Sequence, residues 1–466
     1  MRMYTYKGDN RLILGICLAV STFWLFTMSM MVVTPVMNQT LALPMATLNM
    51  AVSMAALIAG VSIVVAGGIA DAIGRVKMTK IGIVLSIVGC VCCALTTAET
   101  TSLLMIGRVL QGLSAALIMP SSLALINDYY EGAERQRALS FWSISSWGGG
   151  GIASFFGGAV ASLLGWQWIF WLSIPVAIVA LFLIQGTPES KVAVSEGKQR
   201  VDYVGLVIFV AGLVMLNLFI TRGAEWGWTS LLTLTMAAGF VMLFFLFLLV
   251  EKRVSQPLID LSLFKNTAYN GAAISNFMLN FCAVGAIFVM SSFVQESKGI
   301  SSFHAGLLTM GYLVTTLIMI RVGERILKTK GPRLPMALGC FLTTIGIALP
   351  MLTFLPDVLY LVFTVIGFAV MGLGLGVSAT PSTDTAVSGA PKDKVGVASG
   401  LYKMASSLGG SFGTAVSGAI YAAVLLVDPS AYTKAGFWGI FANVFIAFLA
   451  LIIVLICVPK QAARAS

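Results

Sequence analysis

The chain has 466 residues, of which 58% are hydrophobic and only 10% are charged. A water-soluble protein of this length could not bury so much apolar surface, so the composition excludes a soluble fold and indicates a polytopic membrane protein. The formal net charge is +10, but the basic residues are scattered between apolar runs, which suits membrane topology better than a nucleic-acid partner.

Apolar runs long enough to cross a membrane follow one another along the whole chain. A spanning helix needs about 20 mainly apolar residues. Fourteen segments meet this requirement: residues 12–35, 47–70, 79–97, 102–126, 138–161, 167–186, 203–222, 229–250, 269–294, 303–322, 335–355, 358–381, 396–425 and 435–458. The first run is too long for a signal-peptide core, so we expect it to be retained as a helix.

The basic residues indicate how these helices are oriented. If the N-terminus lies inside, most of the 28 lysines and arginines fall at inner boundaries, whereas Arg222, Lys298 and Lys434 fall outside. This bias is the one that the positive-inside rule describes. Because the number of spans is even, the sequence predicts that both termini are cytoplasmic.

Two stretches of the chain resemble one another. IMPSSLALI, from Ile118, aligns with ATPSTDTAV, from Ala379, which places Pro120 on Pro381. Small residues of the next span repeat at the same offset: Ser145, Ser146, Gly148, Gly149 and Gly157 match Ser406, Ser407, Gly409, Gly410 and Gly418. An offset that is kept across two spans and their loop indicates an internal duplication.

The duplication predicts the domain organisation. It pairs the fourth and fifth spans with the twelfth and thirteenth, so we expect six-helix bundles over residues 1–201 and 253–466, with an inserted two-helix hairpin over 202–252. The segment GERILKTKGPR, from Gly323, resembles a worn copy of GGIADAIGRVK, from Gly67. The predicted fold class is therefore an all-α polytopic membrane protein with a site between two repeated halves, as in alternating-access transporters.

Three short motifs carry a family resemblance. The loop between the second and third spans contains Gly67, Asp71, Gly74 and Arg75; the fourth span contains LMIGRVLQGLSAA; and the fifth contains GGGIASFFGG over residues 149–158. Together these resemble the loop 2–3 signature, the fourth-helix pattern and the antiporter-associated motif of the major facilitator superfamily. The fourteen spans, with ERQRALSFWSISSWGGGG and GLGLGVSATPSTDTAVSGAP, resemble its branch of drug:proton antiporters, among them quinolone efflux pumps.

The sequence departs from the family's pattern at two places. The usual Gly-Pro of the fifth-helix motif is Ala153-Ser154 here, which leaves open the kink that it implies. The first span of this branch often carries an aspartate, whereas SMMVVTP, from Ser29, has none. The proton role of that aspartate is therefore not carried over to this chain.

Arg108, Glu225 and Asp384 are the candidates for proton coupling. An intramembrane cation such as Arg108 is a functional-site hypothesis by default, and the resemblance implies a role in proton coupling. The alternative is that its side chain extends to the outer interface and braces neighbouring helices. Glu225, at the outer end of the hairpin, and Asp384, at the inner end of the twelfth span, are candidate carboxylates or merely interfacial charges. Lys403 could pair with Asp384, and Glu296 is interpreted as a boundary residue.

Two groups of residues are candidates for gating. The resemblance implies that the loop with Gly67, Asp71, Gly74 and Arg75 latches the outward-open state by charge and helix-dipole contacts; the alternative is a solvated turn. In the fifth span, small residues recur every four positions and form a ridge that lets helices pack closely and slide. Gly149, Gly157 and Gly158 belong to this group. Static packing is the alternative reading of the ridge.

A pocket for amphipathic drugs should be lined by aromatic and methionine side chains with a few polar groups. The candidates come from the first, fourth and ninth spans: Phe23, Trp24, Phe26, Met30, Gln111, Asn276 and Asn280. The first and ninth spans are equivalent in the two halves, so both are expected to face a central cavity. Lipid-facing side chains are the alternative for each position.

We interpret the sequence as a proton-coupled multidrug efflux antiporter of the bacterial cell membrane. Its expected partners are amphipathic drugs such as quinolones, protons and the lipid bilayer, and we expect no nucleic acid and a monomer. Seven cysteines in apolar runs and one histidine argue against a disulfide framework or a metal site, and the lack of a phosphate-binding loop argues against ATP drive. We therefore expect no enzyme activity and no cofactor besides the proton gradient. The alternatives are a narrow exporter of a metabolite, peptide or metal ion, and a non-transporting sensor or channel on the same scaffold.

Overall fold

The computed structural model describes residues 7–131, 144–190, 203–254, 261–388 and 395–460, together with residues 134, 137, 138, 141, 142 and 259. Helix is the regular secondary structure throughout these residues. Twelve helices in this part of the chain are long and apolar enough to cross a membrane, and two shorter apolar helices cover Ile152–Leu163 and Arg333–Ala348. The predicted all-α membrane fold is confirmed at this level.

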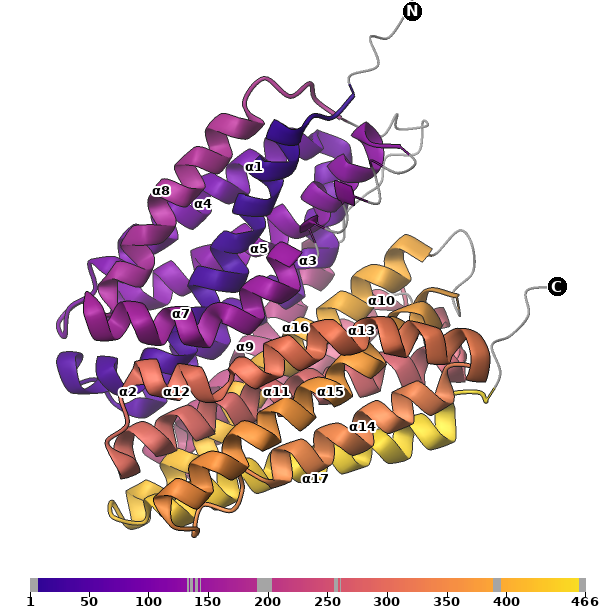
Figure 1. Ribbon diagram of the computed structural model, residues 1–466. Helices are drawn as coiled ribbons and strands as arrows, with labels where there is room; N and C mark the ends of the chain where they lie inside the picture. Colours follow the sequence, from indigo (N-terminus) through magenta and orange to yellow (C-terminus); the bar gives the residue numbers. More distant parts are fainter. Residues whose placement is uncertain are drawn as a thin grey trace, which may run out of the picture.

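The first helices form an N-terminal bundle (Figure 1). They are α1 (Asn10–Ser21), the π-helical turn η1 (Thr22–Thr27), α2 (Met28–Leu41), α3 (Met45–Ile73), α4 (Arg75–Ala94), α5 (Thr101–Tyr129), the π-helical turn η2 (Ile144–Gly148), α7 (Gly149–Leu163) and α8 (Gln167–Ile184). Helix α5 packs against α3 and α4, α8 packs against α1 and α4, and α7 packs against α2. The bundle therefore has α5 near its centre.

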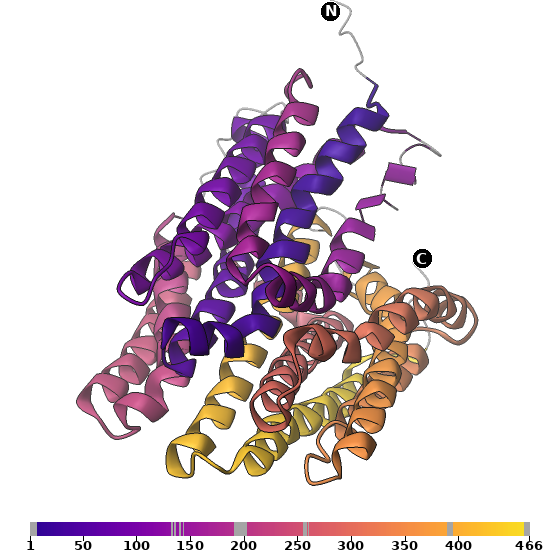
Figure 2. The same ribbon diagram turned by 60° about the vertical axis from the view of Figure 1, so that its left-hand side comes forward.

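A helical hairpin follows this bundle. It consists of α9 (Tyr203–Trp226) and α10 (Leu231–Glu251), joined by a turn in which Gly227 has a φ of +85° and Ser230 caps α10 by accepting a hydrogen bond from Thr233 N. Figure 2 shows the hairpin on one flank of the molecule. Helix α9 contacts both α3 and α16, whereas large apolar side chains of α10 such as Leu231 and Phe245 are exposed. In a membrane these side chains would face lipid.

The remaining helices form a C-terminal bundle. They are η3 (Leu261–Lys265), α11 (Thr267–Lys298), α12 (Ser302–Leu308), α13 (Met310–Lys330), α14 (Arg333–Ala348), α15 (Asp357–Ser388), α16 (Val395–Val427) and α17 (Tyr432–Cys457). Helix α11 packs against α16 and α17, and α15 packs against α13 and α14. Asn266 caps α11 and Ser301 caps α12, and the Ser301 hydroxyl also bonds to His304 Nδ1 at 2.8 Å. The single histidine is thus a helix-end residue.

The two bundles meet toward one end of the molecule and diverge toward the other (Figures 1 and 2). We call the end at which they meet the distal end, because the described chain begins and finishes at the opposite, terminal end. Two helix pairs, α3 with α16 and α7 with α12, form the largest contacts between the bundles at the distal end, and α2 adds smaller contacts with α11 and α12. These two interfaces are equivalent under the predicted duplication, which also aligns Pro120 inside α5 with Pro381 inside α15.

The connection between α13 and α14 corrects one detail of the repeat. Gly323 lies inside α13, where an added Cβ atom would meet the backbone of Val377, so it is a packing residue and not a hinge. The chain instead turns at Gly331, which has a φ of +76°, just as it turns at Gly74, with a φ of +135°, between α3 and α4. Both positions favour glycine because side chains rarely adopt this backbone conformation.

Candidate functional site

The Arg108 side chain lies inside the N-terminal bundle, where α5 packs against α3 and η1. It is fully buried. Its Nε donates to the Ala51 carbonyl at 2.8 Å, its Nη1 to the Thr27 carbonyl at 3.0 Å, and its Nη2 to the Val52 carbonyl at 3.3 Å. One guanidinium thereby joins α5 to α3 and to the π-helical turn. The side chain braces these helices from within the bundle and does not extend to the membrane interface.

Gln111 extends this polar cluster one turn along α5. Its Oε1 accepts a hydrogen bond from Arg108 Nη1 at 2.8 Å, and its Nε2 donates to the Cys90 sulfur at 3.3 Å. Gln111 is buried as well. Among the described residues no carboxylate lies within 4.0 Å of Arg108. The guanidinium is therefore stabilised by carbonyl and amide dipoles. A charged side chain inside a membrane is costly, and such residues usually have a function.

The π-helical turn η1 carries the aromatic residues that the sequence predicted for drug binding. Such turns are rare and occur mostly at functional sites. Phe26 packs edge-to-face on Phe156 of α7, with ring centroids 5.1 Å apart, and Phe23 packs in the same way on Trp24 at 5.4 Å. Phe23, Phe26 and Met30 are buried, but Trp24 is partly exposed. Its indole N–H is buried without a hydrogen-bond partner in the described part of the chain.

The two predicted asparagines of α11 lie against α16. Asn276 Nδ2 donates to the Tyr402 carbonyl at 3.0 Å and to the Ser406 hydroxyl at 2.6 Å, and Asn280 Nδ2 donates to the Asn276 carbonyl at 2.8 Å. Tyr402 in turn donates from its hydroxyl to Ser382 at 2.8 Å. The asparagines therefore connect α11, α16 and α15, and sequence reasoning did not include Tyr402 in this group.

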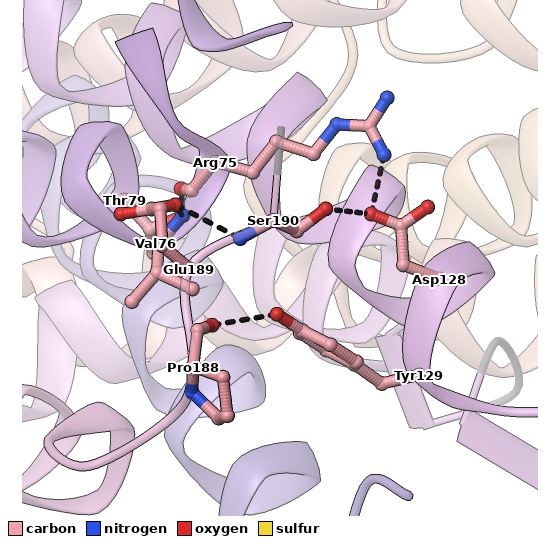
Figure 3. Close-up of polar contacts among 8 residues, drawn as sticks. All are labelled: Arg75, Val76, Thr79, Asp128, Tyr129, Pro188, Glu189 and Ser190. Atoms are coloured by element: carbon pink, nitrogen blue, oxygen red, sulfur yellow. Dashed lines mark hydrogen bonds and ion pairs between the residues drawn. The ribbon is translucent and has the colours of Figure 1, made fainter. Parts of the chain in front are cut away.

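The loop between α3 and α4 is held by charged residues of its own bundle (Figure 3). The Arg75 guanidinium forms an ion pair with Asp128 at the end of α5, and Asp128 also accepts a hydrogen bond from the Ser190 hydroxyl. Gly67 packs beside Pro120 of α5. Asp71 lies in α3, and its side chain falls outside the residues that the structure describes.

Glu189, which sequence reasoning missed, caps the N-terminus of α4 (Figure 3). Its carboxylate accepts hydrogen bonds from Val76 N at 2.9 Å and from Lys77 N at 3.1 Å. A carboxylate at a helix N-terminus satisfies free N–H groups and complements the helix dipole. An added Cβ atom at Gly74 would lie only 2.5 Å from the Glu189 carboxyl carbon. This close approach, together with the positive φ, explains the glycine. In the sequence, Glu189 is recognisable only as an acidic residue just after the sixth apolar run, which does not indicate that it caps α4.

The small-residue ridge of α7 packs against the first span. An added Cβ at Gly149 would lie 3.2 Å from the Trp24 Cβ, and one at Gly157 would lie 2.7 Å from the Ser29 carbonyl. The Ser29 hydroxyl also donates to the Ala153 carbonyl at 2.8 Å. In the second half, Gly409 and Gly413 of α16 pack equally closely on the backbone of α11. The two ridges therefore occupy equivalent places in the two bundles.

Gly158 differs from the rest of the ridge because it packs against the other bundle. An added Cβ there would meet the Ser302 carbonyl of α12, and one at Gly306 would lie 2.5 Å from the Ser154 carbonyl of α7. Helices α7 and α12 thus cross at backbone contact distance. Ser154, which replaces the proline of the family motif, supplies one of the contacting carbonyls.

The candidate carboxylates lie far apart along the structure. Asp384 is exposed near the terminal end of α15. Glu225 forms an ion pair with Arg222 at 2.6 Å near the distal end of α9 and lines a pocket that Glu296 of α11 also lines. Glu296 accepts a hydrogen bond from the Tyr421 hydroxyl at 2.7 Å.

The arrangement of two bundles that meet at paired helix crossings is a membrane-transporter fold. Over 97% of this chain and 98% of the other, the structure matches a D-xylose-proton symporter with a TM-score of 0.66 and 16% sequence identity. A peptide transporter POT in complex with sulfate matches with a TM-score of 0.69 and 14% identity, over 97% and 96% of the two chains. At such identities the likeness concerns the fold alone.

Sequence similarity then identifies the family. A profile of the Major Facilitator Superfamily matches residues 15–414. The quinolone resistance protein NorB of Staphylococcus aureus (strain MRSA252) is 50% identical over 457 residues, which are 98% of this chain and 97% of that protein, and NorB of strain JH9 is 51% identical over 456 residues. The chain belongs to the Major Facilitator Superfamily and is a multi-pass bacterial membrane protein.

Proposed function

We propose that this protein is a proton-coupled multidrug efflux antiporter that exports amphipathic compounds, quinolones among them, by alternating access. The observation that carries the proposal is the 50% identity to quinolone resistance proteins over nearly the full length of both chains. Transport rather than enzymatic catalysis follows from the family, and the proton gradient is the proposed energy source, with no cofactor. We propose that the protein works as a monomer.

We propose a topology of fourteen spans with both termini in the cytoplasm. Twelve long helices and the two shorter ones, Ile152–Leu163 and Arg333–Ala348, support this number, and the inner bias of lysines and arginines supports the orientation. Six helices belong to each bundle, over residues 1–201 and 253–466, and the hairpin over 202–252 is an insertion. Under this orientation the distal end is the outer end.

The bundles are joined at the outer end, which corresponds to an inward-facing state. The hydrogen bonds between them in the described residues support this assignment. They link Asn49 to the Ala415 carbonyl, Ser411 to the Ser53 carbonyl, and both Ser291 and Gln295 to the Val32 carbonyl. Ser411 is in the middle of α16, and the other residues lie in the outer halves of their helices. Opening of this end, with closure of the inner end, would complete the transport cycle.

We propose that drugs bind beside η1, between the two bundles. The residues assigned to this site are Phe23, Trp24, Phe26, Met30, Gln111, Asn276 and Asn280. Drug pockets combine apolar and aromatic walls with a few polar groups that fix orientation. The unpartnered indole N–H of Trp24 supports the assignment, because it is a donor that a carbonyl or carboxylate of a drug could satisfy.

Proton coupling and gating are assigned to Arg108 inside the N-terminal bundle and to residues toward the two ends of the molecule. Arg108 would transmit changes at η1 to α3, which it contacts simultaneously. Glu225 and Asp384 are the proposed titrating carboxylates. The loop residues Gly67, Asp71, Gly74 and Arg75, and the α7 glycines Gly149, Gly157 and Gly158, would gate the inner and outer ends. The Arg75–Asp128 pair and the close α7–α12 crossing support these roles.

Transport in inside-out membrane vesicles tests the proposal. The vesicle lumen is acidified, and accumulation of a fluorescent quinolone and of a fluorescent organic cation is followed with and without a protonophore, with vesicles lacking the protein as control. We expect accumulation of both compounds and its loss when the protonophore collapses the gradient. Accumulation that ignores the protonophore would contradict proton antiport. Transport of neither drug, with export of one metabolite, would favour a narrow exporter.

A further inference from the structure

A pocket of about 200 Å³ lies at the distal end, where both bundles and the hairpin meet. Its walls come from the start of α3, from α9, from α11 and from α16, and they are mainly apolar, with Met45, Ala419 and Leu426 among them. Two carboxylates from different elements line the same pocket, Glu225 of α9 and Glu296 of α11. Glu225 is exposed and paired with Arg222, whereas Glu296 is partly buried and has no basic partner among the ion pairs of the described residues, so an apolar pocket penalises the ionised form of Glu296 in particular.

Glu296 has a simple hydrogen-bond environment. The Tyr421 hydroxyl, on a fully buried side chain of α16, donates to Glu296 Oε2 at 2.7 Å. The nearest basic residue along α11, Lys298, points elsewhere, because its ammonium pairs with Asp357 at 2.6 Å and lies over the Phe293 ring at 5.3 Å. A hydroxyl can donate to an ionised carboxylate or accept from a protonated one, so this partner suits both states.

The other charged and titratable groups near the pocket have partners of their own or carry no charge near pH 7. Arg222 and Glu225 of α9 pair with one another. Tyr360 of α15 and Tyr432 of α17 lie near Tyr421, and their hydroxyls carry no charge near pH 7. His304, the titratable residue of α12, bonds to Ser301. The segment of α3 that lines the pocket, Pro44 to Ala46, has no titratable side chain.

Glu296 directly follows a residue that connects the two bundles. The preceding residue, Gln295, donates to the Val32 carbonyl of α2 at 2.8 Å and accepts from Ser302 of α12 at 2.6 Å. On the hairpin side, Glu225 ends a stripe of α9 that begins with Asn217 and Thr221, both buried. The pocket is thus closed by groups whose positions change when the bundles separate.

From this geometry we infer that Glu296 is a proton-binding site that controls closure of the distal end. With a proton on Glu296, the only charges at the pocket are the paired ones of Arg222 and Glu225, and the pocket closes around the Tyr421 hydroxyl. Without it, the pocket gains a net negative charge, and hydration of the Glu296 carboxylate favours separation of α3 and α9 from α11 and α16. The site loads its proton from the outer solution when the distal end is open. This inference rests on the proposed proton-coupled function and gives the inserted hairpin a part in it.

The distance across the distal end at different pH values tests the inference. Spin labels are attached at Gln39 in α2 and Val427 in α16, both exposed, in a variant whose native cysteines are replaced. The protein is reconstituted in lipid nanodiscs without drug. We expect the short, closed distance at low pH and a growing population of a longer distance as the pH rises.

Substitutions show which residues cause the pH-dependent change in this distance. Glu296→Gln, which mimics the protonated group, should keep the short distance at every pH. Glu225→Gln frees Arg222 to attract the ionised Glu296 across the closed pocket, and Tyr421→Phe removes a donor to the ionised form, so both should move the transition to higher pH. Glu99→Gln, at an exposed carboxylate of the same end, is the matched control and should behave as the parent. A Glu296→Gln variant with the parental pH response would overturn the inference, as would a parent distance that ignores pH.

A second measurement does not need the replaced cysteines. Infrared difference spectra of the unaltered chain, recorded between low and high pH, should contain a protonated carboxylic acid band that Glu296→Gln removes and Glu99→Gln retains. Persistence of every such band in Glu296→Gln would also contradict the inference. Both measurements are made without drug and therefore test the Glu296 inference separately from drug transport. Absence of drug transport in vesicles would refute the proposed function, whereas an unchanged pH response in Glu296→Gln would refute only the inference.

Discussion

The two largest interfaces between the bundles, which the predicted duplication would make equivalent, differ in chemistry. The α3–α16 interface is polar: Asn49 donates to the Ala415 carbonyl at 3.2 Å, and Ser411 donates to the Ser53 carbonyl at 2.8 Å. The α7–α12 interface has no hydrogen bond between its two helices in the described residues, and consists of a glycine crossing with a Phe155–Phe303 contact, 5.5 Å between ring centroids.

The hairpin and Arg108 both form further hydrogen bonds with α3 beside the α3–α16 interface. Asn217 of α9 exchanges hydrogen bonds with the Ser53 hydroxyl at 3.2 and 3.3 Å, so α9 covers the α3–α16 contact. Arg108 holds the Ala51 and Val52 carbonyls of the same helix from the other side. The hairpin therefore adds hydrogen bonds to one of the two interfaces. We expect the reinforced one to persist longer while the glycine crossing separates more easily.

Replacement of Arg108 should have the largest effect on this comparison. Arg108→Ala leaves carbonyls of α3 and η1 without a donor, and each unsatisfied buried group costs about 1–3 kcal/mol. We expect loss of drug transport in vesicles and a lower thermal unfolding midpoint in detergent. Arg108→Lys retains the charge but not the planar fork, so it should be intermediate in stability. Arg321→Ala, at an exposed arginine, is the control. Unchanged transport in Arg108→Ala would refute its proposed role.

Bulk at the glycine crossing should have the next largest effect. Gly158→Leu and Gly306→Leu place side chains against opposing backbone, and overpacking typically costs about 1–3 kcal/mol. We expect wider spin-label distances across α7 and α12 and little change across α3 and α16. Gly212→Ala in the hairpin, where an added Cβ would meet Leu243 at an ordinary 3.4 Å, is the control. Equal widening of both interfaces would show that they do not move independently.

Removal of the hairpin contact should have a smaller effect. Asn217→Ala leaves the Ser53 hydroxyl without its partner on α9, and a hydrogen bond of this kind contributes about 0.5–1.5 kcal/mol. A double-mutant cycle with Ser53→Ala, measured by thermal unfolding, should give a coupling energy of that size. We also expect Asn217→Ala to open the α3–α16 interface more readily. Additive effects of the two substitutions would mean that the hairpin does not brace this interface.

Ser411→Ala should have the smallest effect. It removes one hydrogen bond, to the Ser53 carbonyl, and leaves the Asn49 bond and the hairpin in place. We expect a stability loss of about 1 kcal/mol or less and nearly normal transport. The vesicle assay, made alongside Asn217→Ala, checks the order of the two effects. A larger loss in Ser411→Ala than in Asn217→Ala would show that α16 itself, not α9, stabilises the interface.

The helices were predictable from the sequence, whereas most partners in the candidate site were not. Each of the fourteen predicted segments is helical over most of its described residues, but some end earlier than predicted: α4 ends at Ala94 within the segment 79–97, and α14 ends at Ala348 within the segment 335–355. Arg108 and Gln111 were each predicted as site residues in separate roles, proton coupling and drug binding, and the structure joins them by a hydrogen bond. The carbonyls of Thr27 and Ala51 were not predictable, because every residue has a carbonyl and only packing selects which ones face the guanidinium.

The sequence by itself determined the class of protein, the helices, the repeat and the family motifs, because apolar length, glycine spacing and basic flanks are local features of the chain. The tertiary structure decided which charges meet. Arg75 pairs with Asp128, 53 positions away, and Glu189 caps α4 from 113 positions away. Glu225 and Glu296 share a pocket only because α9 and α11 both reach α16 at the distal end. Electrostatic partners depend on distances in space, and those are set by how helices pack.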